Sequence, residues 1–255
     1  MSELGYWNTR ALCEPIRLLL HYAGEGFTDK RYQVGPPPDY DKSEWYTEKE
    51  HIGLSVPNLP YYKDGVVVLT QTNAILRYLA EKHGLDGDTA ADRARAHMLM
   101  EGLRDWMNEF FDVTYCCAPW QDPTDDVHIL GEFQCVNDNR ARKFKELSLS
   151  YLRDRLPYFL SMYSSVLSAN NPWVLGSRIC YVDFILYEYL DQHLAFDRNC
   201  LNSYPILVDF VRRFRALPSI AAYLNSDNFK AEPLHNRYSH FHTGWVESLL
   251  GDKKK

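Results

Sequence analysis

A tyrosine near the start of the chain has the clearest chemical potential of any residue in it. Tyr6 lies in a short predicted strand, Leu4 to Trp7, at whose end side chains can project into the crevice above a sheet. A phenol in that place can donate a hydrogen bond to a thiolate. Ionising most of a thiol of pKa ~8.5 at neutral pH takes a shift of roughly 2 units, or about 2.7 kcal/mol. One charge-assisted hydrogen bond contributes about 1.5 to 3 kcal/mol. Tyr6 could therefore activate a thiol, although 17 other tyrosines in the chain also suit a packed core.

Two other groups of residues suggest different chemistry. Cys13 lies near the start of a predicted helix, where thiol oxidoreductases keep a nucleophilic thiolate, but it has Glu14 beside it and no second cysteine in a CxxC pattern. Near the end of the chain, His235, His240 and His242 lack any closed metal-ligand spacing. We expect these histidines to lie in a solvated tail, and we predict no metal site.

Composition excludes several classes of protein. The 255 residues are 45% hydrophobic and 24% charged, as in an ordinary globular protein, and the six cysteines have no zinc-type spacing. The net charge of -6 argues against a nucleic-acid partner. The sequence has no run of about 18 apolar residues and does not begin like a leader peptide, so we expect a cytoplasmic protein with no membrane partner.

The first 84 residues change structural period often. The patterns predict the order βαβαββα, with an Asp64-Gly65 hairpin turn and a last helix that ends at Gly84. This order is that of the thioredoxin-like fold, an α/β fold with a mixed four-stranded sheet, in which a proline before the third strand is cis. Pro60 is placed to be that residue. The predicted strands are 4–7, 27–34, one that begins near 61, and 66–69, and the predicted helices are 14–22, 43–50 and 72–83.

The remainder of the chain reads as an all-α domain. We expect domain 1–84, a linker over 85–89 and a helical domain over 90–255. Between Cys116 and Asn139 the helical periodicity breaks, which predicts an irregular excursion, and the terminal GDKKK is expected to fray. The predicted helices are 90–115, 140–167, 182–194, 205–216 and 219–224.

Five ordered segments resemble the mu class of the cytosolic glutathione S-transferases. They are LGYWNTRAL, PPPDYDKSEWYTEK, VPNLPYY, QTNAILRYLA and NPWVLGSRICYVDFILYEYLD. The resemblance implies a homodimeric glutathione transferase that attaches the thiolate of reduced glutathione, its co-substrate, to hydrophobic electrophiles, with no permanently bound cofactor. Two alternatives stay open: a carrier or structural relative without activity, and the Cys13-dependent thiol oxidoreductase.

The resemblance also assigns roles to single residues. Tyr6 would stabilise the thiolate, and Tyr115 would donate a proton or hydrogen bond to the electrophile. Asp105 would reach across the dimer to the partner's glutathione. The expected glutathione-binding residues are Tyr6, Trp7, Leu12, Trp45, Lys49, Asn58, Leu59, Pro60, Gln71, Thr72 and Asp105. The expected electrophile site consists of Trp7, Thr9, Leu12, Val34, Asn108 and Tyr115.

The sequence departs from the mu pattern in two places that matter for function. Val34 and Asn108 replace methionines that the class commonly has, which predicts a stiffer and more polar electrophile site. Val56 replaces a phenylalanine that the class inserts into its partner, while Arg77 remains at the expected two-fold axis. We therefore expect a homodimer of altered strength, and an excursion over 116–139 that narrows access for bulky electrophiles.

Overall fold

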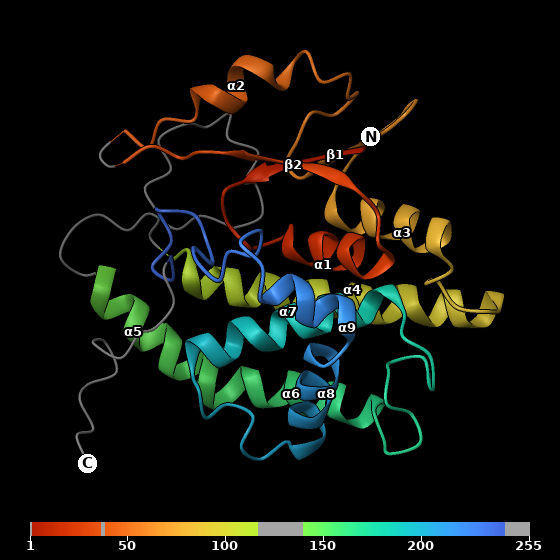
Figure 1. Cartoon of the computed structure of the whole chain (residues 1–255). Coiled ribbons are helices and arrows are strands. Elements are labelled where there is room, and N and C mark those ends of the chain that lie inside the picture. The colour runs from red at the N-terminus through yellow and green to blue at the C-terminus, as the bar shows by residue number, and fades with distance from the viewer. Residues whose placement is uncertain (1, 37–38, 117–139, 243–255) are drawn as a thin grey trace.

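The computed structural model describes residues 2–36, 39–116 and 140–242 (Figure 1). The strands are β1 (Ser2–Trp7), β2 (Phe27–Tyr32), β3 (Tyr61–Asp64) and β4 (Val67–Thr70). The helices that accompany them are α1 (Glu14–Ala23), α2 (Ser43–Lys49) and α3 (Thr72–His83). The helices that follow are α4 (Ala90–Thr114), α5 (Arg140–Ser150), a π-helical turn η1 (Tyr151–Arg155), α6 (Leu156–Val166), α7 (Tyr181–Phe196), α8 (Pro205–Arg215) and α9 (Pro218–Leu224).

The four strands form one mixed sheet in the order β2-β1-β3-β4. β1 pairs in parallel with β2, placing Tyr6 opposite Arg31, and antiparallel with β3. Gly5 is required in β1, because a Cβ atom there would lie 2.1 Å from the ring of Tyr61. The predicted mixed four-stranded sheet and the predicted order βαβαββα along the chain are confirmed.

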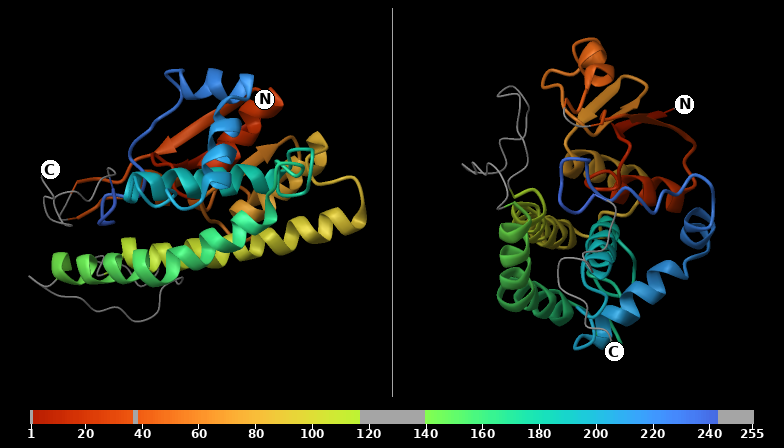
Figure 2. Two further views of the ribbon diagram at one scale, coloured as in Figure 1. Left: turned by 90° about the horizontal axis from the view of Figure 1, so that it is seen from below. Right: turned by 90° about the vertical axis from the view of Figure 1, so that its left-hand side faces the viewer.

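The elements stack in layers (Figures 1 and 2). Helix α2 lies on one side of the sheet, whereas α1 and α3 cover the other side and separate it from α4 and α7. Almost every residue of α7 is buried, including charged ones such as Glu188. Residues 232–242 return from the helical region and cross the end of α4, where the backbone N–H of His240 donates to the carbonyl of Thr114 at 2.8 Å.

Most predicted elements lie within two residues of the observed ones, and the Leu59–Pro60 bond is cis as expected. The helix predicted over 140–167 contains the π-helical turn η1 just before Pro157. The excursion over 116–139, apart from Cys116, and the final residues fall outside the described residues. The division into domains at residues 84 and 90 stays a prediction. No helix within the described ranges is both long and apolar enough to cross a membrane.

The prediction of a solvated histidine tail is wrong. His235 is fully buried, and Tyr238 and Phe241 are nearly so. The segment is rich in aromatic and histidine side chains, whose apolar area favours burial once each polar ring atom has a partner. We call residues 232–242 the C-terminal strap, because it is joined to both the loop after β1 and the end of α4.

Candidate functional site

Tyr6 lies at the end of β1 with its side chain almost fully buried. Its hydroxyl accepts a hydrogen bond from the backbone N–H of Leu12, and burial raises the pKa of this phenol well above its ordinary value. Among the described residues, none accepts the hydroxyl hydrogen of Tyr6. The group is therefore a neutral phenol with a hydrogen bond left to donate, as the chemistry predicted for it requires.

Tyr115 follows the end of α4, and the C-terminal strap holds it in place. The ring of His235 stacks on the Tyr115 ring at 5.2 Å with 17° between the planes. The backbone N–H of Asn236 donates to the Tyr115 hydroxyl at 3.2 Å, and the Tyr238 ring lies 5.8 Å away. Burial raises the pKa of Tyr115, and smaller contributions come from the charges that Tyr238 and Tyr6 would carry. The three phenols thus lie in one neighbourhood.

Sequence reasoning missed the residues of this strap. Sequence patterns for a metal or a helix do not find them, because the strap has neither a ligand spacing nor a regular period. The signal that was available is composition: five of the eight residues from His235 to His242 are aromatic or histidine. Such density is unusual for a tail that stays in water.

The residues predicted to bind the glycyl end of glutathione lie around α2. Trp45 is buried, with its ring 5.4 Å from that of Tyr32 and 6.2 Å from that of Tyr61. Lys49 is half-buried with its ammonium 5.7 Å from the Tyr46 ring. α2 therefore has one side chain fixed in the core and one cation near its end.

Asn58 and Leu59 lie just before β3. The side-chain Oδ1 of Asn58 accepts the backbone N–H of Leu59 at 2.7 Å. Thr70 donates to the carbonyls of both Asn58 and Pro60. These bonds fix the loop before β3, and a ligand that pairs with the Leu59 N–H must replace Asn58 as its acceptor.

Gln71 and Thr72 mark the start of α3. Gln71 has φ 75°, a value rare outside glycine that costs about 1–3 kcal/mol and concentrates at functional positions. No side chain caps the start of α3, and Thr72 instead donates to the Leu12 carbonyl at 3.1 Å. The first N–H groups of this helix can therefore receive a carboxylate.

Two of the residues predicted for the electrophile site line a pocket between the first 34 residues and the strap. Thr9 and Val34, both predicted for this site, line the pocket, whose volume is about 220 Å³. The other lining residues are mostly polar and come from the segments just after β1 and β2 and from the strap: Asn8, Gln33, Glu232, Pro233, Asn236, Arg237 and His242. Thr9 Oγ1 and Asn236 Oδ1 are buried and have no hydrogen-bond partner among the described residues.

The other predicted residues of the electrophile site lie at different depths. Trp7 and Leu12 are half-buried, with the Trp7 ring edge-on to Tyr32 at 6.4 Å. Asn108 is half-buried on α4, one turn before Asp112. The strap adds the charged residues Glu232 and Arg237 to the pocket that Val34 lines, and Asn108 is not among its lining residues.

The residues predicted to act at a dimer interface are exposed in the single chain. The Asp105 side chain is 70% exposed on α4, and Val56 is 68% exposed. Arg77 binds Glu101 at 2.9 Å and so faces α4. Asp105 therefore makes no contact with the Tyr6 neighbourhood of its own chain, and any role in glutathione binding requires a second copy.

A buried ionic network joins the loop after β1 to α7. Arg10 binds Glu188 through Nε at 3.1 Å and Nη2 at 2.6 Å, and Asp191 at 2.5 Å. Gln192 donates to Glu188 at 2.8 Å, and Arg215 binds Asp191. The backbone N–H of Arg10 also donates to the carbonyl of Pro233 in the strap. The network therefore fixes the loop that contains Leu12, the hydrogen-bond partner of Tyr6.

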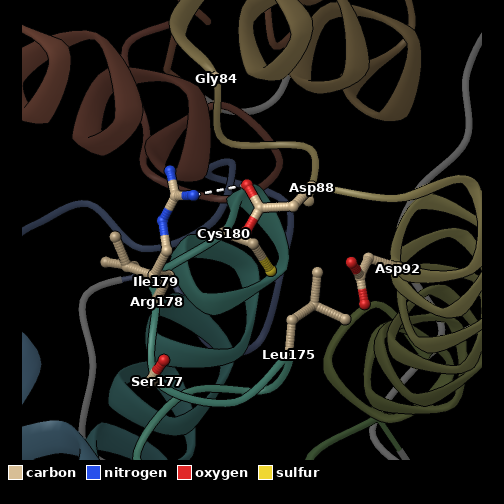
Figure 3. A pocket seen from close by; sticks show the side chains of 9 residues that line it. Gly84, Asp88, Asp92, Leu175, Ser177, Arg178, Ile179 and Cys180 are labelled. Carbon is tan, nitrogen blue, oxygen red and sulfur yellow. Dashed lines mark hydrogen bonds and ion pairs between the residues drawn. The ribbon is translucent and has the colours of Figure 1, made fainter.

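A second pocket, of about 80 Å³, lies between the segment after α3 and the start of α7, away from the predicted site residues (Figure 3). Arg178 binds Asp88 at 2.5 Å across it. The pocket contains none of the predicted site residues. In the described parts of the chain, no group of three or more histidine, cysteine or acidic residues could hold a metal ion.

Comparison with known proteins agrees over nearly the whole chain. Residues 2–81 match the family described as "Glutathione S-transferase, N-terminal domain", and residues 125–227 match "Glutathione S-transferase, C-terminal domain". Glutathione S-transferase Mu 4 of Mus musculus is 38% identical over 92% of this chain and 95% of its own length. Glutathione S-transferase Mu 1 of Oryctolagus cuniculus is 41% identical over 91% and 94%. The crystal structure of the glutathione S-transferase Blo t 8 aligns with a TM-score of 0.78 at 27% identity, covering 94% of this chain and 99% of the other.

Proposed function

This chain belongs to the glutathione S-transferase family, and we propose that it catalyses the conjugation of reduced glutathione with electrophiles. Its sequence relatives are mu-class members, and the mixed sheet followed by a helical region is the family's fold. In the proposed reaction the glutathione thiolate attacks the electrophile, forming a thioether, and the leaving group or the opened ring takes the displaced electron pair.

The observation that carries the proposal is the hydroxyl of Tyr6. It accepts from Leu12 and keeps its own hydrogen, and its raised pKa keeps it protonated at neutral pH. A bound thiolate can take that hydrogen bond, which contributes about 1.5 to 3 kcal/mol. This is the size needed to lower a thiol pKa by roughly 2 units.

The rest of glutathione would lie along the sheet edge from α2 to α3. Lys49 and Trp45 would hold the glycyl carboxylate, Leu59 would pair with the cysteinyl backbone after Asn58 releases its N–H, and the uncapped start of α3 at Thr72 would take the γ-glutamyl carboxylate. Pro60 and Gln71 shape the two turns between these points. Glutathione is the co-substrate, and we propose no permanently bound cofactor.

We further propose a cytoplasmic homodimer. The exposed Asp105 carboxylate suits the ammonium of glutathione in the partner subunit, because it contacts nothing in its own site. Val56, exposed at the expected interface, would make the dimer weaker than one with phenylalanine there.

The thiol oxidoreductase alternative has little support. A nucleophilic cysteine needs a lowered pKa and access to solvent. Cys13 is fully buried, and burial raises the pKa of its thiol to about 12. The alternative that remains is a carrier that binds glutathione without activating it.

The test is an ultraviolet titration of enzyme-bound glutathione, following thiolate absorbance against pH. In wild type we expect a thiol pKa roughly 2 units below the free value, and in Tyr6→Phe a return toward that value. Tyr158→Phe, at an exposed tyrosine, serves as the matched control and should not change the thiol pKa. Binding with an unshifted thiol would favour the carrier, and no binding would refute the glutathione pocket.

A further inference from the structure

The Tyr115 hydroxyl has one bond fixed and one free. It accepts the backbone N–H of Asn236, and among the described residues no acceptor takes its hydrogen. Whether that hydrogen reaches an electrophile depends on the orientation of the ring, and the residue with its face against the ring is His235.

His235 is held more firmly than stacking alone would require. Its Nε2 lies 3.1 Å from Gln192 Oε1, and its Nδ1 lies 3.3 Å from Ser239 Oγ. The other end of Gln192, Nε2, donates to Glu188 at 2.8 Å. Burial raises the pKa of Glu188, but both of its oxygens accept from Arg10, at 3.1 and 2.6 Å. In this ionised form Glu188 only accepts, so the amide of Gln192 has its nitrogen toward Glu188 and its oxygen toward His235.

The protonation of His235 follows from this direction. Because Gln192 Oε1 can only accept, Nε2 of His235 must carry hydrogen, which leaves Nδ1 as an acceptor. The Ser239 hydroxyl beside Nδ1 has a single hydrogen, which Nδ1 shares with the Thr114 carbonyl, 3.0 Å from Ser239 Oγ. Burial, with repulsion from His193, His242 and Arg10, lowers the pKa of His235 to about 3, so the ring stays neutral at physiological pH. A fully buried neutral imidazole with both nitrogens engaged can orient a neighbour but cannot supply protons to the reaction.

We propose that His235 is a positioning residue for Tyr115, and that Gln192 and Glu188 fix the imidazole so that the Tyr115 hydroxyl points at the electrophile. The inference rests on the proposed function and deepens it. It predicts a dependence on the electrophile's chemistry: opening an epoxide places negative charge on an oxygen that needs a donor, whereas displacement of chloride from chlorodinitrobenzene needs no protonated leaving group.

The experiment measures kcat and KM for styrene oxide and chlorodinitrobenzene with glutathione. His235→Phe keeps the size of the ring and its stacking but loses the bond to Gln192. Gln192→Met removes the same bond from the other side, together with the bond from Gln192 to Glu188. In both variants we expect kcat with the epoxide to fall on the order of ten-fold. Complete removal of a well-placed proton donor lowers a rate by this factor or more, and a misoriented donor should fall at the lower end. We expect the rate with chlorodinitrobenzene and the KM for glutathione to stay within about two-fold.

A double-mutant cycle with Tyr115→Phe separates positioning from structure. If His235 acts through Tyr115, His235→Phe has no further effect on the epoxide reaction once the hydroxyl is gone. An equal fall with both electrophiles, or additive effects in the cycle, would overturn the inference. So would an unchanged epoxide rate in Tyr115→Phe, in which case continued turnover of chlorodinitrobenzene would leave the conjugation function standing. If wild type showed no lowered pKa for the thiol of bound glutathione, that result would instead refute the proposed function itself. Should His235→Phe fail to fold, the Gln192→Met cycle decides the question alone.

Discussion

The buried network around Arg10 allows a sharp prediction about stability. Arg10→Met removes three charge-assisted hydrogen bonds, to both oxygens of Glu188 and to Asp191. In this variant Asp191 still binds Arg215. Among the described residues Glu188 keeps one hydrogen bond, from the amide of Gln192, and its side chain is fully buried from water. Breaking a buried ion pair at one partner costs about 3–5 kcal/mol, and the surviving partners place our expectation at about 3 kcal/mol.

The double variant Arg10→Met/Glu188→Met tests the cause of that loss. With both charges gone, the main remaining cost is the unpaired amide of Gln192, so we expect a loss of about 1 kcal/mol relative to wild type. The assay is urea unfolding followed by tryptophan fluorescence. Equal destabilisation of the single and double variants would refute the view that an unpaired Glu188 causes the loss.

The dependence on pH gives a second check. In Arg10→Met the buried Glu188 loses its cation, so its pKa in the folded state rises further above the unfolded value. A group with a raised pKa contributes stability below its unfolded pKa and loses it as pH rises through the folded pKa. The deficit of Arg10→Met should therefore be smaller near pH ~5 than near pH ~8, whereas that of the double variant, which lacks Glu188, should not grow with pH. A deficit that is the same at both pH values would count against the argument.

Two further predictions concern acid stability and the dimer. Burial lowers the pKa of His193 to about 4, so the unfolded chain binds more protons below pH ~6.5, and stability should fall as pH drops from there, by at most about 3 kcal/mol for this residue. Unfolding free energies measured down to pH ~4.5 should show a weaker slope in His193→Gln, and equal slopes would contradict the assignment. Val56→Phe should tighten the proposed dimer by about 1–3 kcal/mol, or roughly 5- to 150-fold in the dissociation constant. Sedimentation equilibrium measures this, with Val66→Phe at the fully exposed hairpin turn as control; equal effects of the two would exclude Val56 from the interface.

The fold could be predicted from sequence because its signals are local. The hairpin turn at Asp64-Gly65, the stop at Gly84 and the periodic helices each follow from a few neighbouring residues. The π-helical turn η1 could not be predicted, since the sequence around it continues an ordinary helical pattern and the insertion of one residue leaves no local mark.

In the candidate site, too, the residues in local motifs could be predicted, whereas features that depend on long-range contacts could not. Tyr6 and the polar residues of the first domain stand in ordered motifs, whereas the hydrogen-bond partner of Asn58 and the burial of Trp45 depend on contacts that a motif does not specify. The strap was misjudged for a physical reason. His235 can be buried because its ring packs against Tyr115 and because Gln192, 43 residues earlier, offers an acceptor to its ring nitrogen, and neither contact is visible in the local sequence.

That long-range pairing bears on which electrophiles the protein can take. The pocket wall combines Thr9 and Val34 from the first domain with Asn236 and Arg237 from the strap. The strap in turn is fastened to the first domain by the backbone bonds from Arg10 and Ala11 to Pro233 and Leu234. The proposed stabilisation of the thiolate by Tyr6 would depend on the same loop, because the backbone of Leu12 in it donates to the Tyr6 hydroxyl. Substitutions of Asn236 or Arg237 should therefore change the pocket wall without changing the stabilisation of the thiolate. Loss of Arg10 should change both, because the strap and Leu12 are each bonded through the loop that Arg10 anchors.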